Sequence, residues 1–255
     1  MEEQYAICRV AIAPIRAEAS DQAEMVSQLL FGDGVKVLEK TDRWWKIQNA
    51  DDNYEGWVDF KQVISYSKSQ ASGFMAPAAI HNAITAADGS KYYLPAGSNL
   101  PGFNNGYCFL ADEKFKVEFE PLVVDFNQPI VDIKELALFF KNAPYQWGGR
   151  TIFGIDCSGF VQTVFKMAGL KLKRDASQQV EDGDTVDFLS EARCGDVAFF
   201  DNEEGRIVHV GILLSNNEII HSSGKVKIDP VDDQGIYSKE LRRYSHKLRI
   251  IKRFF

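Results

Sequence analysis

One cysteine and two histidines have the residue types and positions that covalent catalysis by a thiol nucleophile requires. Cys157 follows Gly154-Ile155-Asp156 and opens a run with apolar residues at helical spacing, so we expect a helix to begin there. The positive end of a helix lowers the pKa of a cysteine and favours the thiolate. Asp156 is well placed to cap this helix. A buried structural cysteine is the alternative interpretation.

A thiolate nucleophile needs a base within hydrogen-bonding reach, and the base needs a group that orients it. His209 lies inside the apolar run 207–214, and His221 ends the apolar run 218–221. Because only Ser215-Asn216-Asn217 joins the two runs, we expect an antiparallel hairpin with both imidazoles on one sheet face. One imidazole can then orient the other. For either histidine alone, a hydrogen-bonded core position is the alternative.

A zinc site is the second chemistry that these residue types allow. Four residues offer zinc ligands: Cys157, Cys194, His209 and His221. No two of them have the close spacing of a ligand pair, so we expect no metal and no cofactor. Two further histidines stand alone among polar neighbours and are expected on the surface: His81 and His246.

The elements that must position these residues follow from hydrophobic periodicity. We expect a helix that includes Ile133 and Phe139 and ends near Pro144, and a second helix from Cys157 to about Ala168 that Gly169 stops. Strands are expected at 196–200, 207–214, 218–221 and 248–254. Helices followed by an antiparallel sheet indicate an α+β fold for residues 129–255.

The N-terminal half is expected to be built from strands alone. In residues 1–65, short apolar segments alternate with turn clusters such as Gly32-Asp33-Gly34, which is typical of a small β-barrel. This segment also resembles a bacterial SH3-like domain, through Trp44-Trp45-Lys46-Ile47 and Gly56-Trp57-Val58 among others. Residues 66–128 have a weaker pattern of the same kind and are interpreted as a second, diverged SH3-like module.

Composition limits the partners and the compartment. The net charge of −7 and the pI of 5.2 argue against binding to nucleic acid or to an anionic membrane. The first residues are acidic and no apolar signal segment follows them, so we expect a cytoplasmic protein. The four cysteines contain no CxxC pair, which favours free thiols over a disulfide framework.

Five short motifs, in this order and spacing, resemble the NlpC family of papain-like murein peptidases across roughly residues 130–255. They are Tyr145-Gln146-Trp147-Gly148-Gly149, Asp156-Cys157-Ser158-Gly159-Phe160, Gly195-Asp196-Val197, His209-Val210-Gly211 and Ile220-His221. The resemblance implies a papain-like domain in which helices pack on an antiparallel sheet. It implies Cys157 as nucleophile, His209 as general base and His221 as its orienting partner. It also implies that the Tyr145 hydroxyl stabilises the oxyanion.

An SH3-like module followed by this domain is similar to a narrower group, the γ-D-glutamyl-diamino acid endopeptidases. Members of that group act on murein peptides with a free N-terminal L-alanine. The resemblance implies that an acidic residue of the first module holds the substrate ammonium, with Glu24 our candidate and Glu18 the alternative. The other residues to which it gives contact with the substrate are Asp156, Tyr54, Trp147, Ser158 and Ser177.

The implied function is therefore hydrolysis of the γ-D-glutamyl-diamino acid bond of free murein peptides, with release of L-Ala-D-Glu for recycling. Two alternatives belong to other classes. One is a secreted hydrolase of polymeric peptidoglycan. The other is a wall-binding protein with an inactive catalytic domain, against which the presence of Cys157, His209 and His221 argues.

Overall fold

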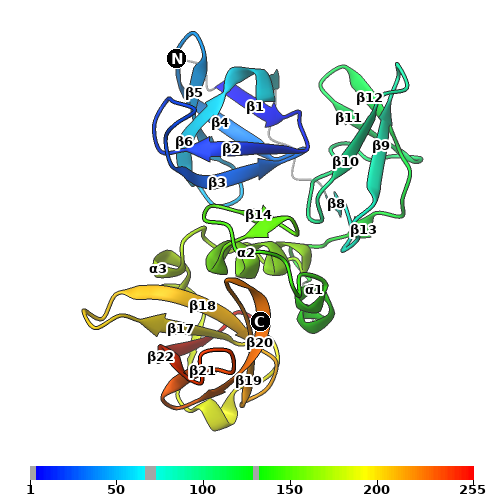
Figure 1. Cartoon of the computed structure of the whole chain (residues 1–255). Helices are drawn as coiled ribbons and strands as arrows, with labels where there is room; N and C mark the ends of the chain where they lie inside the picture. Colours follow the sequence, from blue (N-terminus) through cyan, green and yellow to red (C-terminus); the bar gives the residue numbers. More distant parts are fainter. Residues whose placement is uncertain (1–3, 67–72, 129–131) are drawn as a thin grey trace. The chain divides into compact units, whose positions relative to one another are not determined.

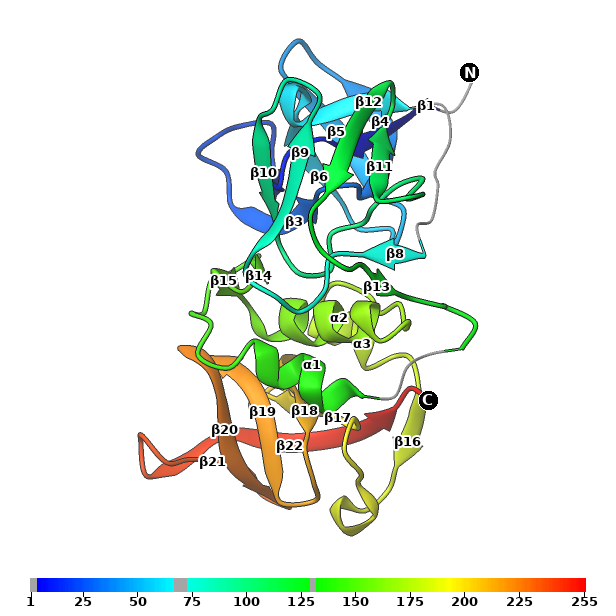
Figure 2. The same cartoon turned by 90° about the vertical axis from the view of Figure 1, so that its right-hand side faces the viewer.

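The structure is a computed structural model that describes residues 4–66, 73–128 and 132–255 (Figures 1 and 2). The chain forms two compact units, Met1–Phe126 and Asn127–Phe255. The first unit contains the residues of both predicted β modules, and the second contains the predicted catalytic residues. The division into 1–65, 66–128 and 129–255 stays a prediction.

The first part of unit 1 is an antiparallel sheet with the strand order β3-β2-β6-β5-β4-β1-β7. Buried residues of these strands, among them Ile15, Leu29 and Ile47, form one apolar core. The predicted apolar segments form strands, and two further strands at the ends of this region were not predicted. The elements are β1 (Gln4–Cys8), β2 (Ile12–Arg16), β3 (Met25–Leu30), β4 (Gly34–Lys40), β5 (Trp44–Asn49), β6 (Glu55–Asp59), the 3-10 turn η1 (Phe60–Gln62) and β7 (Val63–Tyr66).

The second part of unit 1 is a four-stranded sheet, β10-β9-β12-β11, beside the short pair β13-β8. Its core residues Ile84, Leu110 and Phe115 share one cluster with Ile7 of β1 and with Phe31, which follows β3, so both parts are packed together in one unit. The elements are β8 (Phe74–Met75), β9 (Asn82–Ala86), β10 (Lys91–Leu94), β11 (Tyr107–Leu110), β12 (Glu113–Val117) and β13 (Leu122–Val123).

Unit 2 combines helices with a sheet of the order β16-β22-β17-β18-β19-β20-β21, in which β21 also pairs with β22. This extra pairing closes β17 to β22 into a barrel, and α2 packs against β18 and β19. The elements are α1 (Ile133–Phe139), β14 (Arg150–Thr151), β15 (Gly154–Ile155), α2 (Cys157–Met167), α3 (Ala176–Gln179), β16 (Asp184–Val186), η2 (Leu189–Glu191), β17 (Val197–Asp201), β18 (Ile207–Leu213), β19 (Glu218–Ser223), β20 (Lys225–Asp232), β21 (Gly235–Ser238) and β22 (Arg243–Arg253).

Helix α2 has the boundaries that its sequence predicts. Asp156 is its N-cap, with an extended backbone and a side chain that accepts a hydrogen bond from the Gly159 amide. Gly169 follows the helix with a φ of +90°, a conformation that glycine adopts without strain. All eleven residues of the helix are buried. The α+β class is confirmed.

No helix in the described part of the chain combines the length and the apolar composition that crossing a membrane requires.

Candidate active site

Cys157 lies at the point where β18 and β19 separate. Regular pairing of these strands ends at Gly211 and His221, and the backbone amide of Val210 donates a hydrogen bond to Cys157 instead. Only 8% of Cys157 is exposed. Burial raises the pKa of the thiol to about 11 and the Asp156 charge adds to this, while hydrogen bonds from the Ser158 and Val210 backbone oppose it. The expected lowering of this pKa at the helix terminus is therefore outweighed by burial.

His209 and His221 meet as the hairpin predicts. His221 is directly opposite Gly211, so His209 lies diagonally across the strand pair on the same face. His209 Nε2 and His221 Nδ1 are 2.8 Å apart. A β-carbon at position 211 would lie 2.8 Å from the His221 β-carbon, so glycine at this position gives the His221 side chain its room. Burial keeps His209 neutral by moving its pKa well below the usual value.

Asp229 extends this chain of contacts and was not predicted. Its Oδ2 lies 3.2 Å from His221 Nε2, and the carboxylate is 3% exposed. Burial raises the Asp229 pKa, but hydrogen bonds from His221 and the Lys239 amide outweigh it, so the net pKa is lowered and the group stays ionised. Lys227 Nζ is 3.6 Å from the same carboxylate. The order His209–His221–Asp229 resembles a catalytic relay that ends on a buried charge.

His246 corrects the sequence interpretation, which expected this residue to be isolated on the surface. It lies on β22 opposite Ile236, and its ring stacks on that of His209 with centroids 3.9 Å apart and planes 22° apart. It is half-buried, and burial lowers its pKa to about 4. The closure of the barrel through β21 and β22, which the sequence pattern did not predict, is what brings it to this site.

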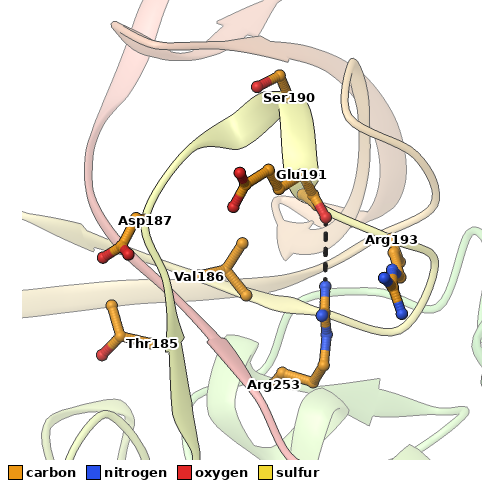
Figure 3. Close-up of a pocket in the computed structure, with 8 residues that line it drawn as sticks. Thr185, Val186, Asp187, Ser190, Glu191, Arg193 and Arg253 are labelled. Atoms are coloured by element: carbon orange, nitrogen blue, oxygen red, sulfur yellow. Dashed lines mark hydrogen bonds between the residues drawn. The ribbon is translucent and has the colours of Figure 1, made fainter.

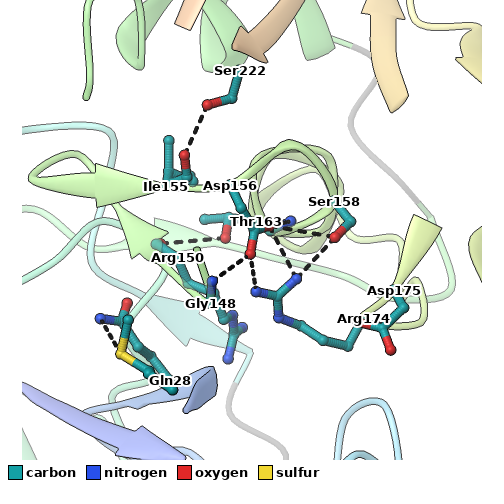
Figure 4. A network of polar contacts seen from close by, with 12 residues as sticks. Gln28, Gly148, Arg150, Ile155, Asp156, Ser158, Thr163, Arg174, Asp175 and Ser222 are labelled. Carbon is teal, nitrogen blue, oxygen red and sulfur yellow. Dashed lines mark hydrogen bonds and ion pairs between the residues drawn. The ribbon is translucent and has the colours of Figure 1, made fainter. Parts of the chain in front are cut away.

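Asp156 is the centre of a polar network at the start of α2 (Figure 4). It accepts hydrogen bonds from the amides of Gly148 and Gly159 at 2.8 and 2.6 Å. Both of its oxygens also contact the guanidinium of Arg174, which in turn reaches the Ser158 hydroxyl at 2.9 Å. Asp156 and Arg174 are 5% and 1% exposed. Asp156 therefore holds the helix start that carries the nucleophile, and its contact with a substrate ammonium stays a prediction.

Three other predicted residues belong to the same unit. Tyr145 is close enough to Cys157 and Asp156 for their charges, together with burial as the larger cause, to raise its pKa to about 12, so its hydroxyl remains a donor. Trp147 is 61% exposed. Ser177 is exposed on α3, and the N-cap of this helix is Asp175 rather than Ser177. Substrate contacts of Trp147, Ser158 and Ser177 stay predictions.

Tyr54 and Glu24 belong to unit 1. Tyr54 is half-buried before β6, and its amide hydrogen-bonds to Asp52 Oδ1 at 2.9 Å. Glu24 is exposed immediately before β3, as is Glu18 in the preceding turn. Their predicted role at a substrate ammonium is not tested by these positions.

Two other features of unit 2 stand apart from the predicted site. Cys194, a zinc candidate in the sequence, is exposed in the turn before β17. A surface pocket lies between β16, η2 and the end of β22 (Figure 3). Arg253 in its wall donates to the Glu191 carbonyl at 3.3 Å and is held by an ion pair with Asp196.

Comparison with known proteins agrees with this geometry. Residues 142–245 match the NlpC/P60 family, and residues 15–63 match the bacterial dipeptidyl-peptidase Sh3 domain. A γ-D-glutamyl-L-lysine dipeptidyl-peptidase of Bacillus subtilis is 40% identical over 114 residues, which are 43% of this chain and 38% of that protein. The murein DD-endopeptidase MepS/murein LD-carboxypeptidase of Escherichia coli is 38% identical over 140 residues, 53% of this chain and 70% of that protein.

The fold is shared with solved structures. The crystal structure of an NlpC/P60 family protein from Bacillus cereus superimposes with a TM-score of 0.79 at 19% identity, over 98% of this chain and 99% of that one. The chain thus spans well under half of the Bacillus subtilis relative but nearly all of this structure. With the papain-like fold and the match to most of the Escherichia coli protein, the chain belongs to the NlpC/P60 family of cysteine peptidases and carries a bacterial SH3 domain ahead of the peptidase domain.

Proposed function

We propose that the protein hydrolyses the γ-D-glutamyl-diamino acid bond of murein peptides that have a free N-terminal L-alanine, and releases L-Ala-D-Glu. The observation that carries the proposal is the buried order His209–His221–Asp229, which starts one residue before Val210, whose backbone hydrogen-bonds to the thiol of Cys157. The name of the Bacillus subtilis relative and the match of residues 15–63 to a dipeptidyl-peptidase domain support the substrate.

The arrangement suits acyl transfer by a thiol. Because His209 Nε2 is engaged with His221, Nδ1 is the nitrogen that remains to accept the Cys157 proton as sulfur attacks the γ-carbonyl carbon. The charge of Asp229 stabilises the imidazolium through His221. The Tyr145 hydroxyl donates to the oxyanion. His209 then protonates the leaving amine, and water hydrolyses the thioester to the free γ-carboxylate and the thiol.

Recycling in the cytoplasm is part of this proposal. All four cysteines are free thiols, which suits a reducing compartment. Fractionation of cells that make the protein, with peptidase activity measured in each fraction, tests the location.

A second candidate is cleavage of polymeric peptidoglycan, which the name of the Escherichia coli relative supports. Mass spectrometry of products separates the two. The purified protein is given L-Ala-γ-D-Glu-L-Lys, its diaminopimelate counterpart, and a cross-linked muropeptide still attached to glycan. Release of L-Ala-D-Glu from the free peptides, without products from the glycan-linked substrate, supports the proposal. Products from the glycan-linked substrate alone would replace it with the second candidate.

A further inference from the structure

Three histidines from three different strands of unit 2 meet in one cluster. His209, His221 and His246 come from β18, β19 and β22, and each offers a ring nitrogen within 4.8 Å of the others. The proposed peptidase mechanism uses His209 and His221 and gives His246 no task. A third imidazole in this place therefore needs another explanation.

We propose that these three imidazoles form a binding site for a divalent transition-metal ion such as Zn²⁺, and that the bound ion switches the peptidase off. The inhibitory half of the proposal rests on the proposed function, whereas metal binding itself does not.

The nitrogens lie close enough to share one tetrahedral ion once the His246 ring has turned out of its stack on His209, because an imidazole lone pair lies in the plane of its ring. Zinc binds imidazole nitrogen at about 2.0–2.1 Å, which places two nitrogens of one tetrahedral site about 3.3 Å apart. His209 Nε2 and His221 Nδ1, at 2.8 Å, must open slightly, and the most distant pair must close from at most 4.8 Å. Three protein nitrogens leave a fourth position for water.

The groups behind the imidazoles favour the same nitrogens. Asp229 contacts His221 Nε2 at 3.2 Å, which leaves Nδ1 for the ion. The Ser245 hydroxyl lies 2.9 Å from His246 Nδ1, which leaves Nε2. A carboxylate or another oxygen behind a ligating histidine fixes the ring and raises its basicity in metal sites. His246 is half-buried, so an ion can enter the three-histidine site from the side on which this residue lies.

The local charge also admits a cation. Lys227 is the nearby positive group, but two carboxylates neutralise it, Asp229 at 3.6 Å and Glu240 at 3.0 Å.

Inhibition follows from the position of one proton. In the free protein a proton lies between His209 Nε2 and His221 Nδ1. A metal ion bound to both nitrogens displaces that proton, which moves to His209 Nδ1. His209 then has no lone pair with which to accept the proton of Cys157, and attack on the substrate stops.

The test measures metal binding and activity in parallel. Co²⁺ is added to metal-free protein and its visible absorption is recorded, and Zn²⁺ binding is measured by calorimetry. His246→Phe keeps a ring stacked on His209 but removes the nitrogen ligand. Cys157→Ser removes the thiolate, which is the competing metal ligand. His81→Phe, at an exposed histidine of unit 1, is the matched control.

We expect one ion per chain in the wild type, in Cys157→Ser and in His81→Phe, and at least about 10-fold weaker binding in His246→Phe. Zn²⁺ should inhibit His246→Phe correspondingly less, relative to its own metal-free rate. The proposal is overturned if His246→Phe binds as tightly as wild type, or if binding disappears in Cys157→Ser. Should no murein peptide be cleaved, the binding measurements still decide whether the metal site exists.

Discussion

At the scale of single residues, Cys157 and His209 are both neutral before substrate is attacked. Burial raises the pKa of Cys157 to about 11 and moves that of His209 well below its usual value, so neither group is charged at neutral pH. A helix N-terminus alone would favour the thiolate. Because the apolar surroundings outweigh it, we infer that the thiol proton moves to His209 during the attack rather than before it.

The reactivity of Cys157 should therefore depend steeply on pH. The thiolate fraction grows about tenfold per pH unit below the thiol pKa, so alkylation by iodoacetamide should speed up about tenfold per unit between pH 7 and 9. The measurement needs a Cys194→Ser background, because exposed Cys194 would react in parallel. Cys157→Ala in that background is the control. A rate that stays constant below pH 7 would instead show a preformed thiolate–imidazolium pair.

Asp229 should matter for rate and not for substrate binding. Asp229→Asn keeps the size of the side chain but removes the charge that stabilises His209 through His221, so kcat should fall at least about 10-fold with little change in KM. Asp233→Asn, an exposed neighbour in the turn after β20, should leave both constants as they are. An equal loss in both variants would assign Asp229 a purely structural role.

The sequence predicted His209 and His221 because each stands in an apolar run where a polar side chain needs a reason, and it predicted Cys157 because this residue opens a helix after Gly154-Ile155-Asp156. Asp229 and His246 do not stand in apolar runs, so nothing in their neighbourhood in the sequence sets them apart. Asp229 belongs to Lys225-Val-Lys-Ile-Asp-Pro-Val-Asp, whose many charges resemble a solvated strand, and His246 follows Arg243-Tyr-Ser. Only the closed barrel turns these positions inward, and strand pairing between distant segments leaves no local pattern.

At the scale of elements, the β18–β19 pair depends on close approach at one glycine. A β-carbon at Gly211 would lie 2.8 Å from the His221 β-carbon and 2.8 Å from Ile219 Cδ1. Gly211→Ala should push His221 away from His209 and cost about 1–3 kcal/mol of unfolding free energy.

Activity should fall further in Gly211→Ala than stability alone explains, because the displaced His221 no longer orients the base. Thermal unfolding and kcat, both measured at a temperature where the variant is folded, check this expectation. Gly73→Ala is the control, since a β-carbon there meets only one atom at 3.4 Å. A fully active Gly211→Ala protein would contradict the role of the His209–His221 contact.

Element boundaries were predictable where capping chemistry is local. Asp156 and Gly169 mark the two ends of α2, and α2 is found between them. Strand β20 was missed because its charges and Pro230 hide the apolar period of its inward face, and β21 was missed because its four residues are too few to show a period. The partner of Asp156 was missed for another reason: Arg174 lies in a run of basic residues that reads as surface but is 1% exposed.

At the scale of the whole molecule, the two predicted β modules share a core. Ile7 of the first sheet and Phe31, in the turn after β3, pack in one cluster with Phe115 of the second sheet, so residues 4–66 and 73–126 are parts of one unit. The family match covers residues 15–63 only, and whether residues 66–128 are a diverged SH3-like module stays a prediction. A core shared between segments of different sheets has no periodic signature in either segment.

The whole protein is also the scale at which the free substrate amine is tested. If an acidic residue of unit 1 binds the ammonium of L-alanine, then N-acetylation removes that ion pair and leaves the carboxylate without its partner. We expect kcat/KM to fall at least about 100-fold, which corresponds to about 2.7 kcal/mol. Equal cleavage of acetylated and free peptides would show that the amine is not recognised, and the recycling role would be wrong.

Variants of unit 1 identify the residues that distinguish the free-amine peptide from the acetylated peptide. Glu24→Gln and Tyr54→Phe should slow cleavage of the free-amine peptide but leave the slow cleavage of the acetylated peptide as it is, because only the free peptide uses the ion pair. Glu18→Gln tests the neighbouring acid, and Glu39→Gln, exposed on β4, is the control for loss of one negative charge. A loss shared equally by both peptides would mean that the substitution disturbs folding or catalysis. If only Glu18→Gln narrows the difference in kcat/KM between the free-amine and the acetylated peptide, then Glu18 and not Glu24 is the residue that recognises the N-terminus of the substrate.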